Sequence, residues 1–196
     1  MSPSKRYAGG SILLATPLLI ALLWLPQPEL SPRTLEARAP ADTLPSLVVL
    51  VRHAERDGPS ADDPELTERG RERARELARI LGDVGITGIH ATDFVRTRRT
   101  AEPLANRLGI ETEIFDYRDL ASLATALRGR PGRHLVVGHS NTTDELAVLL
   151  GGRSHGSIAD GWEFDRLYLL TPAPDGSMTT VLMRYGPASV PGDAGE

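Results

Sequence analysis

Short apolar runs alternate with longer amphipathic segments along most of the chain, and this alternation constrains the fold more than any other feature. Residues 47–51 form a continuous apolar run rich in β-branched residues, and a shorter run of the same kind lies at residues 135–137. Such runs are typical of strands that are buried on both faces of a sheet. Further strand candidates lie at residues 86–90 and 111–115.

The segments between these strands place apolar residues at positions i, i+3, i+4 and i+7, which is the spacing of an amphipathic helix. They cover residues 74–81, 101–108 and 120–127. A chain that alternates strands and helices in this way forms a mostly parallel sheet with helices on both faces. We therefore expect an α/β protein built as a three-layer α/β/α sandwich.

Beyond these elements, the pattern predicts one more helix and then a hairpin. The helix starts at about Thr142, because Thr142 and Glu145 have the spacing of a capping box. Residues 166–171 and 178–185 alternate in polarity, and the turn-forming residues 174–176 join them. This arrangement predicts a C-terminal hairpin at the edge of the sheet.

The N-terminal segment resembles an export signal. Lys5 and Arg6 precede an apolar run at residues 12–25, which gives a positively charged region followed by a hydrophobic one. The run is short for a membrane span of roughly 20 residues, and no good cleavage site follows it closely. We interpret residues 1–25 as a signal peptide or signal anchor, with a slight preference for the uncleaved anchor. The expected location is extracytoplasmic, either periplasmic or secreted, and an uncleaved segment would hold the protein at the membrane.

The remaining domain boundaries follow from composition. Residues 26–45 are rich in Pro, Ala and charged residues without periodicity, which is typical of a linker. We expect the folded domain at residues 46–186 and a disordered, Pro/Gly-rich tail at residues 187–196.

Composition also excludes several function classes. The net charge of −4 gives no indication of a nucleic-acid partner. The absence of cysteine excludes thiol catalysis, zinc–thiolate sites and disulfides. The five histidines show no His-Glu-x-x-His spacing, so a metallohydrolase is a weak alternative. We expect no metal and no cofactor.

Basic and histidine side chains follow several predicted strands at their carboxyl ends, where open α/β sheets bind ligands. Arg52 and His53 follow the first strand, Arg96 comes soon after the second, and His139 directly follows the fourth. Each residue alone has an ordinary structural explanation, such as a salt bridge or a structural hydrogen bond. Together, two arginines and two imidazoles at one end of a sheet would repel one another without an anion between them. The sequence therefore predicts a phosphate site.

This arrangement suits phosphoryl transfer. Arg52 and Arg96 can clamp the phosphoryl oxygens with their planar guanidinium groups. His53 can attack phosphorus through an unprotonated ring nitrogen and form a phosphohistidine. His139 would donate a further hydrogen bond to the phosphoryl group, and Glu55 would orient His53 or Arg52 rather than react.

Four segments resemble the motifs of the histidine phosphatase superfamily, also called phosphoglycerate-mutase-like. Residues 50–55 resemble its Arg-His-Gly signature, and residues 66–70 resemble the start of a family helix. Residues 92–101 resemble its Ser-x-Leu-x-Arg-Ala-x-x-Thr-Ala segment, and residues 137–140 its second-histidine segment. The resemblance is closest to the compact branch of small bacterial phosphatases. It implies a phosphorylated histidine at His53, phosphate ligands at Arg52 and Arg96, and a second catalytic histidine at His139.

The sequence departs from the family pattern in two places. Ala54 replaces the usual Gly, and no motif identifies the acid that protonates the leaving group. Asp116 and Asp119 lie in the region where many family members place this acid, although each could equally be a helix cap or a solvated charge. The weaker candidates are Asp160, Glu163 and Asp165.

We expect phosphomonoester hydrolysis, and two alternatives stay open. A phosphomutase would use the same phosphohistidine, but the domain is too short for the lid insertions that exclude water from such enzymes. A noncatalytic binding module for phosphorylated ligands would not need His53 and His139, and both are present. The sequence leaves open whether the substrate is a small phosphorylated molecule or a phosphoprotein, and it leaves the oligomeric state open.

Overall fold

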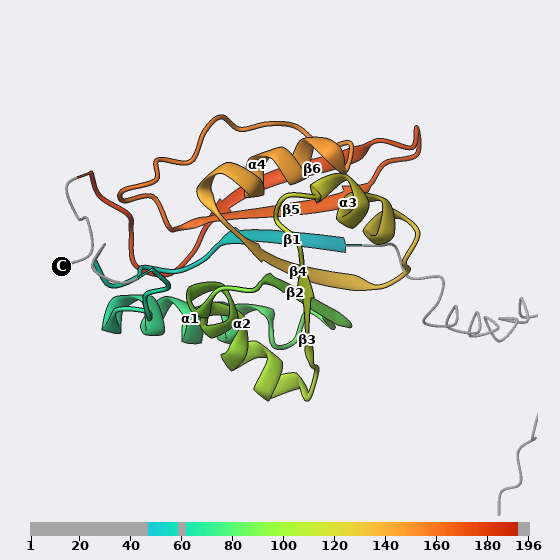
Figure 1. Cartoon of the computed structure of the whole chain (residues 1–196). Helices are drawn as coiled ribbons and strands as arrows, with labels where there is room; N and C mark the ends of the chain where they lie inside the picture. Colours follow the sequence, from blue (N-terminus) through green and yellow to red (C-terminus); the bar gives the residue numbers. More distant parts are fainter. Residues whose placement is uncertain (1–46, 59–61, 192–196) are drawn as a thin grey trace, which may run out of the picture. The chain divides into compact units, whose positions relative to one another are not determined.

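The structure, a computed structural model, describes residues 47–58 and 62–191 (Figure 1). The predicted signal segment and linker lie outside the described residues. Within the described part, no helix is both long enough and apolar enough to cross a membrane. The elements in chain order are β1 Leu47–Arg52, α1 Glu68–Leu81, β2 Gly88–Thr92, α2 Val95–Leu108, β3 Thr112–Phe115, α3 Leu120–Arg128, β4 Arg133–Gly138, α4 Ser140–Leu149, β5 Arg166–Pro172 and β6 Met178–Arg184.

The sheet has the strand order β3-β2-β4-β1-β5-β6. Strands β3, β2, β4 and β1 are parallel to one another, whereas β5 pairs antiparallel with both β1 and β6. Ala173 and Ser177 close the turn between β5 and β6 through a backbone hydrogen bond of 2.8 Å. The predicted α/β fold, with a mostly parallel sheet and an edge hairpin, is therefore confirmed.

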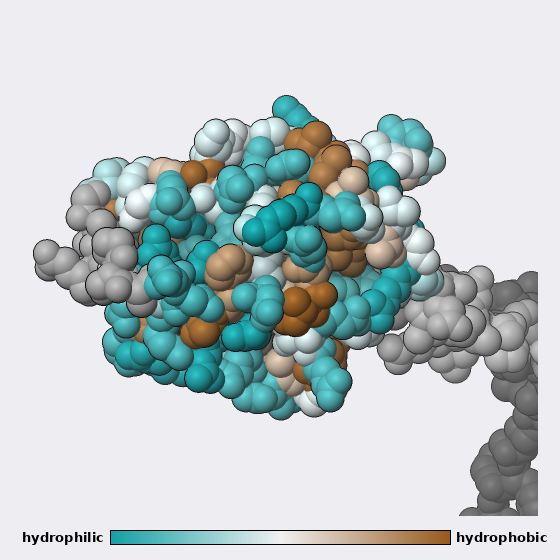
Figure 2. Space-filling model, in the orientation of Figure 1, coloured by the Kyte–Doolittle hydropathy of each residue, from teal (hydrophilic) through white to brown (hydrophobic). Residues whose placement is uncertain are grey.

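Helices cover both faces of the sheet (Figure 1). Alternate residues of β1 point to opposite faces, as the two-residue period of a strand requires. Val49 and Val51 belong to a core cluster with α1 and α2, and Val48 and Leu50 belong to a second cluster with α3 and α4. The face seen in Figure 2 is mainly hydrophilic, with hydrophobic residues in small separate patches. The apolar runs of the sequence therefore lie mostly in the interior between the three layers.

The last helix begins earlier than the capping-box pattern predicted. Helix α4 starts at Ser140 and Thr142 is its third residue, so the prediction of a start at Thr142 is wrong by two residues. The hydroxyl of Thr142 accepts a hydrogen bond of 2.8 Å from the backbone N–H of His139. Thr142 therefore lies in the first turn of α4 and binds the N–H of the N-cap residue His139. The capping-box pattern had placed Thr142 itself at the N-cap position.

Part of the C-terminal tail is bound to the domain, which differs from the expected disorder. The carbonyl oxygen of Pro187 accepts a hydrogen bond of 2.7 Å from Arg73. The N–H of Ser189 donates to Asp165 over 3.2 Å, and the hydroxyl of Ser189 accepts from the N–H of Phe164 over 2.9 Å. Polar contacts of this kind leave no periodic pattern in a sequence. The end of the tail, residues 192–196, lies outside the described residues.

Candidate active site

The strand register brings the loops that follow β1 and β4 together. Strands β1 and β4 are parallel, with Arg52 opposite Gly138. The N–H of His53 donates a hydrogen bond of 2.8 Å to the carbonyl oxygen of Gly138, so the chain stays paired for one residue beyond the sheet. This pairing places His53 beside His139, with ring centroids 5.5 Å apart and the rings in an edge-to-face arrangement.

A cavity of about 440 Å³ opens at this end of the sheet. It contains three of the four principal residues predicted from the sequence, namely His53, Arg96 and His139. The complete lining is His53, Arg56, Phe94, Arg96, Tyr117, His139, Ser140, Asn141 and Asp160.

His53 is buried and its ring orientation is fixed. Its Nδ1 lies 2.8 Å from the carbonyl oxygen of Ala54, which can only accept a hydrogen bond. Nδ1 therefore carries the proton and Nε2 carries the lone pair. Burial, followed by the charge of Arg52, lowers the pKa of His53 well below its usual range. His53 is consequently neutral at physiological pH, with Nε2 as its nucleophilic atom.

Ala54, where the family has Gly, fits the site without strain. Its side chain is fully buried in a small apolar cluster with Leu66 and Ala74. Its N–H donates a hydrogen bond of 2.9 Å to the hydroxyl of Thr100 on α2. The methyl group of Ala54 therefore packs toward α1, and Thr100 links the loop that carries His53 to the helix that carries Arg96.

His139 lines the cavity beside His53. Its Nε2 is 3.0 Å from the hydroxyl of Thr92, at the end of β2, and the ring of Phe94 packs edge-on against it with a centroid distance of 5.2 Å. Burial lowers the pKa of His139 to about 4, with contributions from Arg96 and Arg52. The imidazole is thus neutral at physiological pH. A bound phosphate dianion would favour the protonated form and make His139 a charged donor.

Arg96 extends into the cavity from the first turn of α2. Its guanidinium lies over the ring of Phe94 at 4.2 Å, and one terminal nitrogen is 3.4 Å from the carboxylate of Asp63. The same carboxylate accepts hydrogen bonds of 2.9 and 3.0 Å from the N–H of Val95 at the start of the helix. Asp63 therefore fixes the beginning of α2 and, with it, the position of Arg96. Burial lowers the pKa of Arg96, which still leaves this strongly basic group charged.

Arg52 lies beside the cavity rather than in its lining. One terminal nitrogen donates to the carbonyl oxygens of Ala159 and Glu163 over 3.0 and 3.1 Å. The other donates to the backbone and the carboxylate of Asp160, the latter over 2.8 Å. The Nε atom has no hydrogen-bond partner among the described residues. The guanidinium of Arg52 is therefore bound to residues 159–163, and burial lowers its pKa to about 10.

The structure corrects the expected role of Glu55. Its carboxylate accepts two hydrogen bonds from Arg73 on α1, with distances of 2.6 and 2.8 Å, and Arg69 lies 3.3 Å away. Both Glu55 and Arg73 are buried. The carboxylate of Glu55 therefore pairs with α1 instead of orienting His53 or Arg52.

Four of the five candidate acids lie in structural contacts. Asp119 accepts from the N–H of Ser122 at the start of α3, and Asp116 accepts from the N–H of Arg118. Glu163 and Asp165 form ion pairs, Glu163 with Arg166 and both residues with Arg184; none of these four carboxyl groups lines the cavity. Asp160 is the candidate acid that does line it.

The sequence analysis did not identify Phe94, Tyr117, Arg56 or Asp63. Tyr117 and Phe94 pack against each other with a centroid distance of 5.7 Å, and they form an aromatic wall beside His139. Both follow the carboxyl ends of strands, β3 and β2, so the rule that pointed to Arg96 could have found them. Asp63 lies in a loop without a recognisable pattern, and its position depends on tertiary folding.

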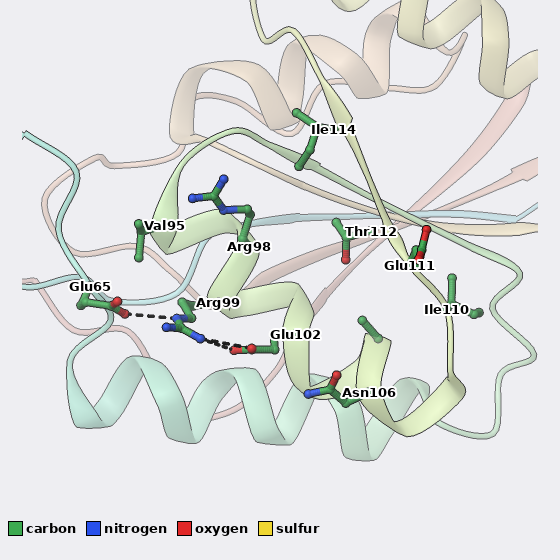
Figure 3. Close-up of a pocket in the computed structure, with 11 residues that line it drawn as sticks. Glu65, Val95, Arg98, Arg99, Glu102, Asn106, Ile110, Glu111, Thr112 and Ile114 are labelled. Carbon is green, nitrogen blue, oxygen red and sulfur yellow. Dashed lines mark hydrogen bonds and ion pairs between the residues drawn. The ribbon is translucent and has the colours of Figure 1, made fainter.

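A larger depression of about 670 Å³ lies elsewhere, between α2 and the edge strand β3 (Figure 3). Its charged residues largely neutralise one another. Arg99 pairs with Glu65 and Glu102, as the dashed lines in Figure 3 show. Arg98 pairs with Asp93. No histidine lines this depression, so it lacks the nucleophile that phosphoryl transfer through a phosphohistidine needs.

Part of the chain is similar to a known protein family. Residues 48–121 match the profile of the histidine phosphatase superfamily (branch 1). A probable phosphoglycerate mutase, GpmB of Escherichia coli, is 42% identical over 77 residues, which is 36% of this chain and 35% of that protein. The chain therefore aligns with only about a third of the length of this relative.

Solved structures resemble the whole domain. The protein histidine phosphatase SixA in complex with tungstate gives a TM-score of 0.58 at 20% identity, covering 70% of this chain and 96% of that one. A mycobacterial glucosyl-3-phosphoglycerate phosphatase gives a TM-score of 0.56 at 17% identity, covering 74% of this chain and 100% of that one. At these identities the likeness concerns the fold. The part of the chain that carries Arg52, His53 and Arg96 is therefore similar to the histidine phosphatase superfamily (branch 1), and the domain has the fold of the solved phosphatases.

Proposed function

We propose that this protein hydrolyses phosphomonoesters through a phosphohistidine intermediate on His53. The observation that carries the proposal is the hydrogen bond between Nδ1 of His53 and the carbonyl oxygen of Ala54. It leaves Nε2 with the lone pair, in a cavity that also contains Arg96 and His139. A buried, neutral imidazole next to fixed cations is suited to attack an anionic phosphoryl group.

In the proposed reaction, Nε2 of His53 attacks phosphorus while Arg96 and His139 donate hydrogen bonds to the phosphoryl oxygens. Arg52 contributes positive charge from beside the cavity. These groups are in place before the substrate arrives, so they stabilise the transition state without reorganisation of solvent. Water then attacks the phosphohistidine, which releases phosphate and restores the neutral imidazole.

Two features favour hydrolysis over phosphomutase activity. The cavity is open, so water can reach a phosphohistidine on His53. The structural neighbours covered almost completely by this chain carry the names of phosphatases, whereas the alignment with the mutase GpmB covers 35% of that protein. The proposed substrate class is a small phosphorylated molecule.

Replacing His53 and Arg96 tests the proposal, because the two residues have different roles. His53→Ala should abolish turnover of 4-nitrophenyl phosphate and the acid-labile phosphate on the protein, yet retain vanadate binding because the arginines remain. Arg96→Ala should weaken vanadate binding and lower kcat/KM by about 10²–10³-fold. Arg98→Ala is the matched control, because Arg98 lies on the same helix and pairs with Asp93.

Two results would contradict the proposal. The nucleophile is misassigned if a rapidly quenched reaction shows phosphate on a residue other than His53. If the wild-type protein binds phosphomonoesters without ever turning them over, the binding-module alternative replaces hydrolysis.

A further inference from the structure

Asp160 has a position that none of the assigned roles explains. Among the described residues that line the cavity, it alone carries a carboxyl group. Its side chain is 75% exposed, whereas that of its partner Arg52 is 2% exposed. The hydroxyl of Ser140 donates a hydrogen bond of 2.6 Å to the Asp160 carboxylate, and Arg52 donates another of 2.8 Å to the same oxygen, Oδ1.

These two contacts hold the carboxylate beside the catalytic groups. Ser140 is the residue after His139, and Arg52 is the residue before His53, so each histidine has a direct chain neighbour bound to Asp160. Because Oδ1 accepts both hydrogen bonds, Oδ2 accepts none from the described residues and is available to a ligand in the cavity.

The backbone around Asp160 is also fixed. Arg52 binds the carbonyl oxygens of Ala159 and Glu163 on either side of it. The carboxylate of Glu163 accepts a hydrogen bond of 3.0 Å from the N–H of Ala159 and so closes the loop on itself. A proton-transfer group must hold a fixed position next to the reacting oxygen. These contacts anchor Asp160 at its backbone and at its side chain.

The proposed hydrolysis needs such a group. An alkoxide leaving group is a strong base, and its departure is slow unless it receives a proton in the transition state. His53 cannot supply the proton, because its Nε2 forms the bond to phosphorus. Asp116 and Asp119, the acids first suggested by the sequence, do not line the cavity.

We propose that Asp160 is the catalytic acid and base of this site, an inference that rests on the proposed phosphatase function. In the first step, the Nε2–P bond forms, the P–O bond to the leaving group breaks, and the carboxylic acid of Asp160 gives its proton to the departing oxygen. In the second step, the carboxylate of Asp160 takes a proton from the attacking water, the new P–O bond forms and the Nε2–P bond breaks. Asp160 and His53 then have their initial protonation states.

The substrate itself creates the acid form. The Ser140 hydrogen bond, with help from the charge of Arg52, holds the pKa of Asp160 below its usual value. A bound phosphoryl group neutralises the field of Arg52 and brings negative charge close to the carboxylate, and both effects raise the pKa of a carboxyl group. A substrate that binds as its monoanion carries the required proton with it.

The test compares leaving groups of different basicity in the full-length protein. Asp160→Asn keeps an oxygen that can accept from Ser140 and Arg52, but it cannot transfer a proton. We expect it to lower kcat/KM for an alkyl phosphate such as ethyl phosphate by about 100-fold or more. The loss of kcat/KM for 4-nitrophenyl phosphate should be about tenfold or less, because 4-nitrophenoxide departs without a proton. Asp116→Asn is the control and should behave as the wild type with both substrates.

The second step provides an independent measurement. With 4-nitrophenyl phosphate, Asp160→Asn should slow hydrolysis of the phosphohistidine, so rapidly quenched samples should contain more phosphorylated protein than the wild type. Equal losses in kcat/KM for both substrates, or a selective loss in Asp116→Asn instead, would overturn the assignment of Asp160. A wild-type protein that never forms phosphohistidine would instead overturn the proposed function, and this result is distinguishable because it does not depend on Asp160.

Discussion

Glu55 offers a test that separates a structural role from a catalytic one. The sequence placed it two residues after His53, as a group that orients the site, whereas the structure pairs it with Arg73. The Arg73 side chain is fully buried, and that of Glu55 is 3% exposed. Arg73 also donates hydrogen bonds of 2.6 and 2.7 Å to the carbonyl oxygens of Tyr185 and Pro187. The pair therefore joins the β1 loop, α1 and the C-terminal tail.

Removing one partner of such a pair leaves an uncompensated buried charge. Glu55→Gln keeps the shape of the side chain but removes its charge, and it points an amide donor at a guanidinium that has only donors. Breaking a buried ion pair in this way costs about 3–5 kcal/mol. This cost is a large part of the roughly 5–15 kcal/mol that stabilises a typical domain. With a urea dependence of about 2 kcal/mol per molar, the unfolding midpoint should fall by about 2 M.

Urea unfolding of the wild type, Glu55→Gln, Arg73→Met and the double variant measures the effect. The double variant should lose much less than the sum of the single variants, because neither charge is then buried alone. Glu76→Gln is a matched control on α1, since Glu76 pairs with Arg79 at the surface, and it should leave the midpoint almost unchanged. Strictly additive losses would refute the pairing. An unchanged midpoint with strongly reduced turnover in Glu55→Gln would instead support the orienting role.

Three further predictions concern pH, metals and export. Burial lowers the pKa values of His53, His90 and His139 in the folded protein, so the unfolded state binds protons more readily than the folded state. The free energy of unfolding should therefore be highest above about pH 6.5 and should fall toward pH 4. The decrease is up to about 1.4 kcal/mol per pH unit for each histidine. His90→Gln, remote from the cavity, should flatten this dependence in urea unfolding at pH 7 and pH 4.5, and a slope identical to the wild type would contradict the assignment. Turnover should persist in EDTA because arginine and histidine side chains supply the positive charge, and a loss reversed by a divalent cation would count against this mechanism. We also propose that residues 1–45 direct export, so fusing them to a reporter active only outside the cytoplasm should give signal, and a silent, cytoplasmic reporter would contradict the proposal.

The sequence by itself was sufficient for the fold class and for the main groups of the candidate site. The strands were recognisable because β1 and β4 are buried on both faces and each contains a continuous apolar run, residues 47–51 in β1 and 135–137 in β4. Because parallel strands end at the same edge of a sheet, His53, Arg96 and His139 could be assigned to one site before any contact was known. Their positions in one cavity agree with that reasoning.

The contacts of the charged side chains were decided only by tertiary structure. Glu55 and Asp160 are both carboxylates close to arginines, and nothing in their local sequence says that one pairs with Arg73 on α1 while the other binds Arg52 beside the cavity. Arg96 is positioned by Asp63, a residue from a loop without periodicity. A periodic pattern records which face of an element is buried, because burial acts on every residue of that face. An ion pair depends on where two distant segments meet, and that meeting point is a property of the folded chain alone.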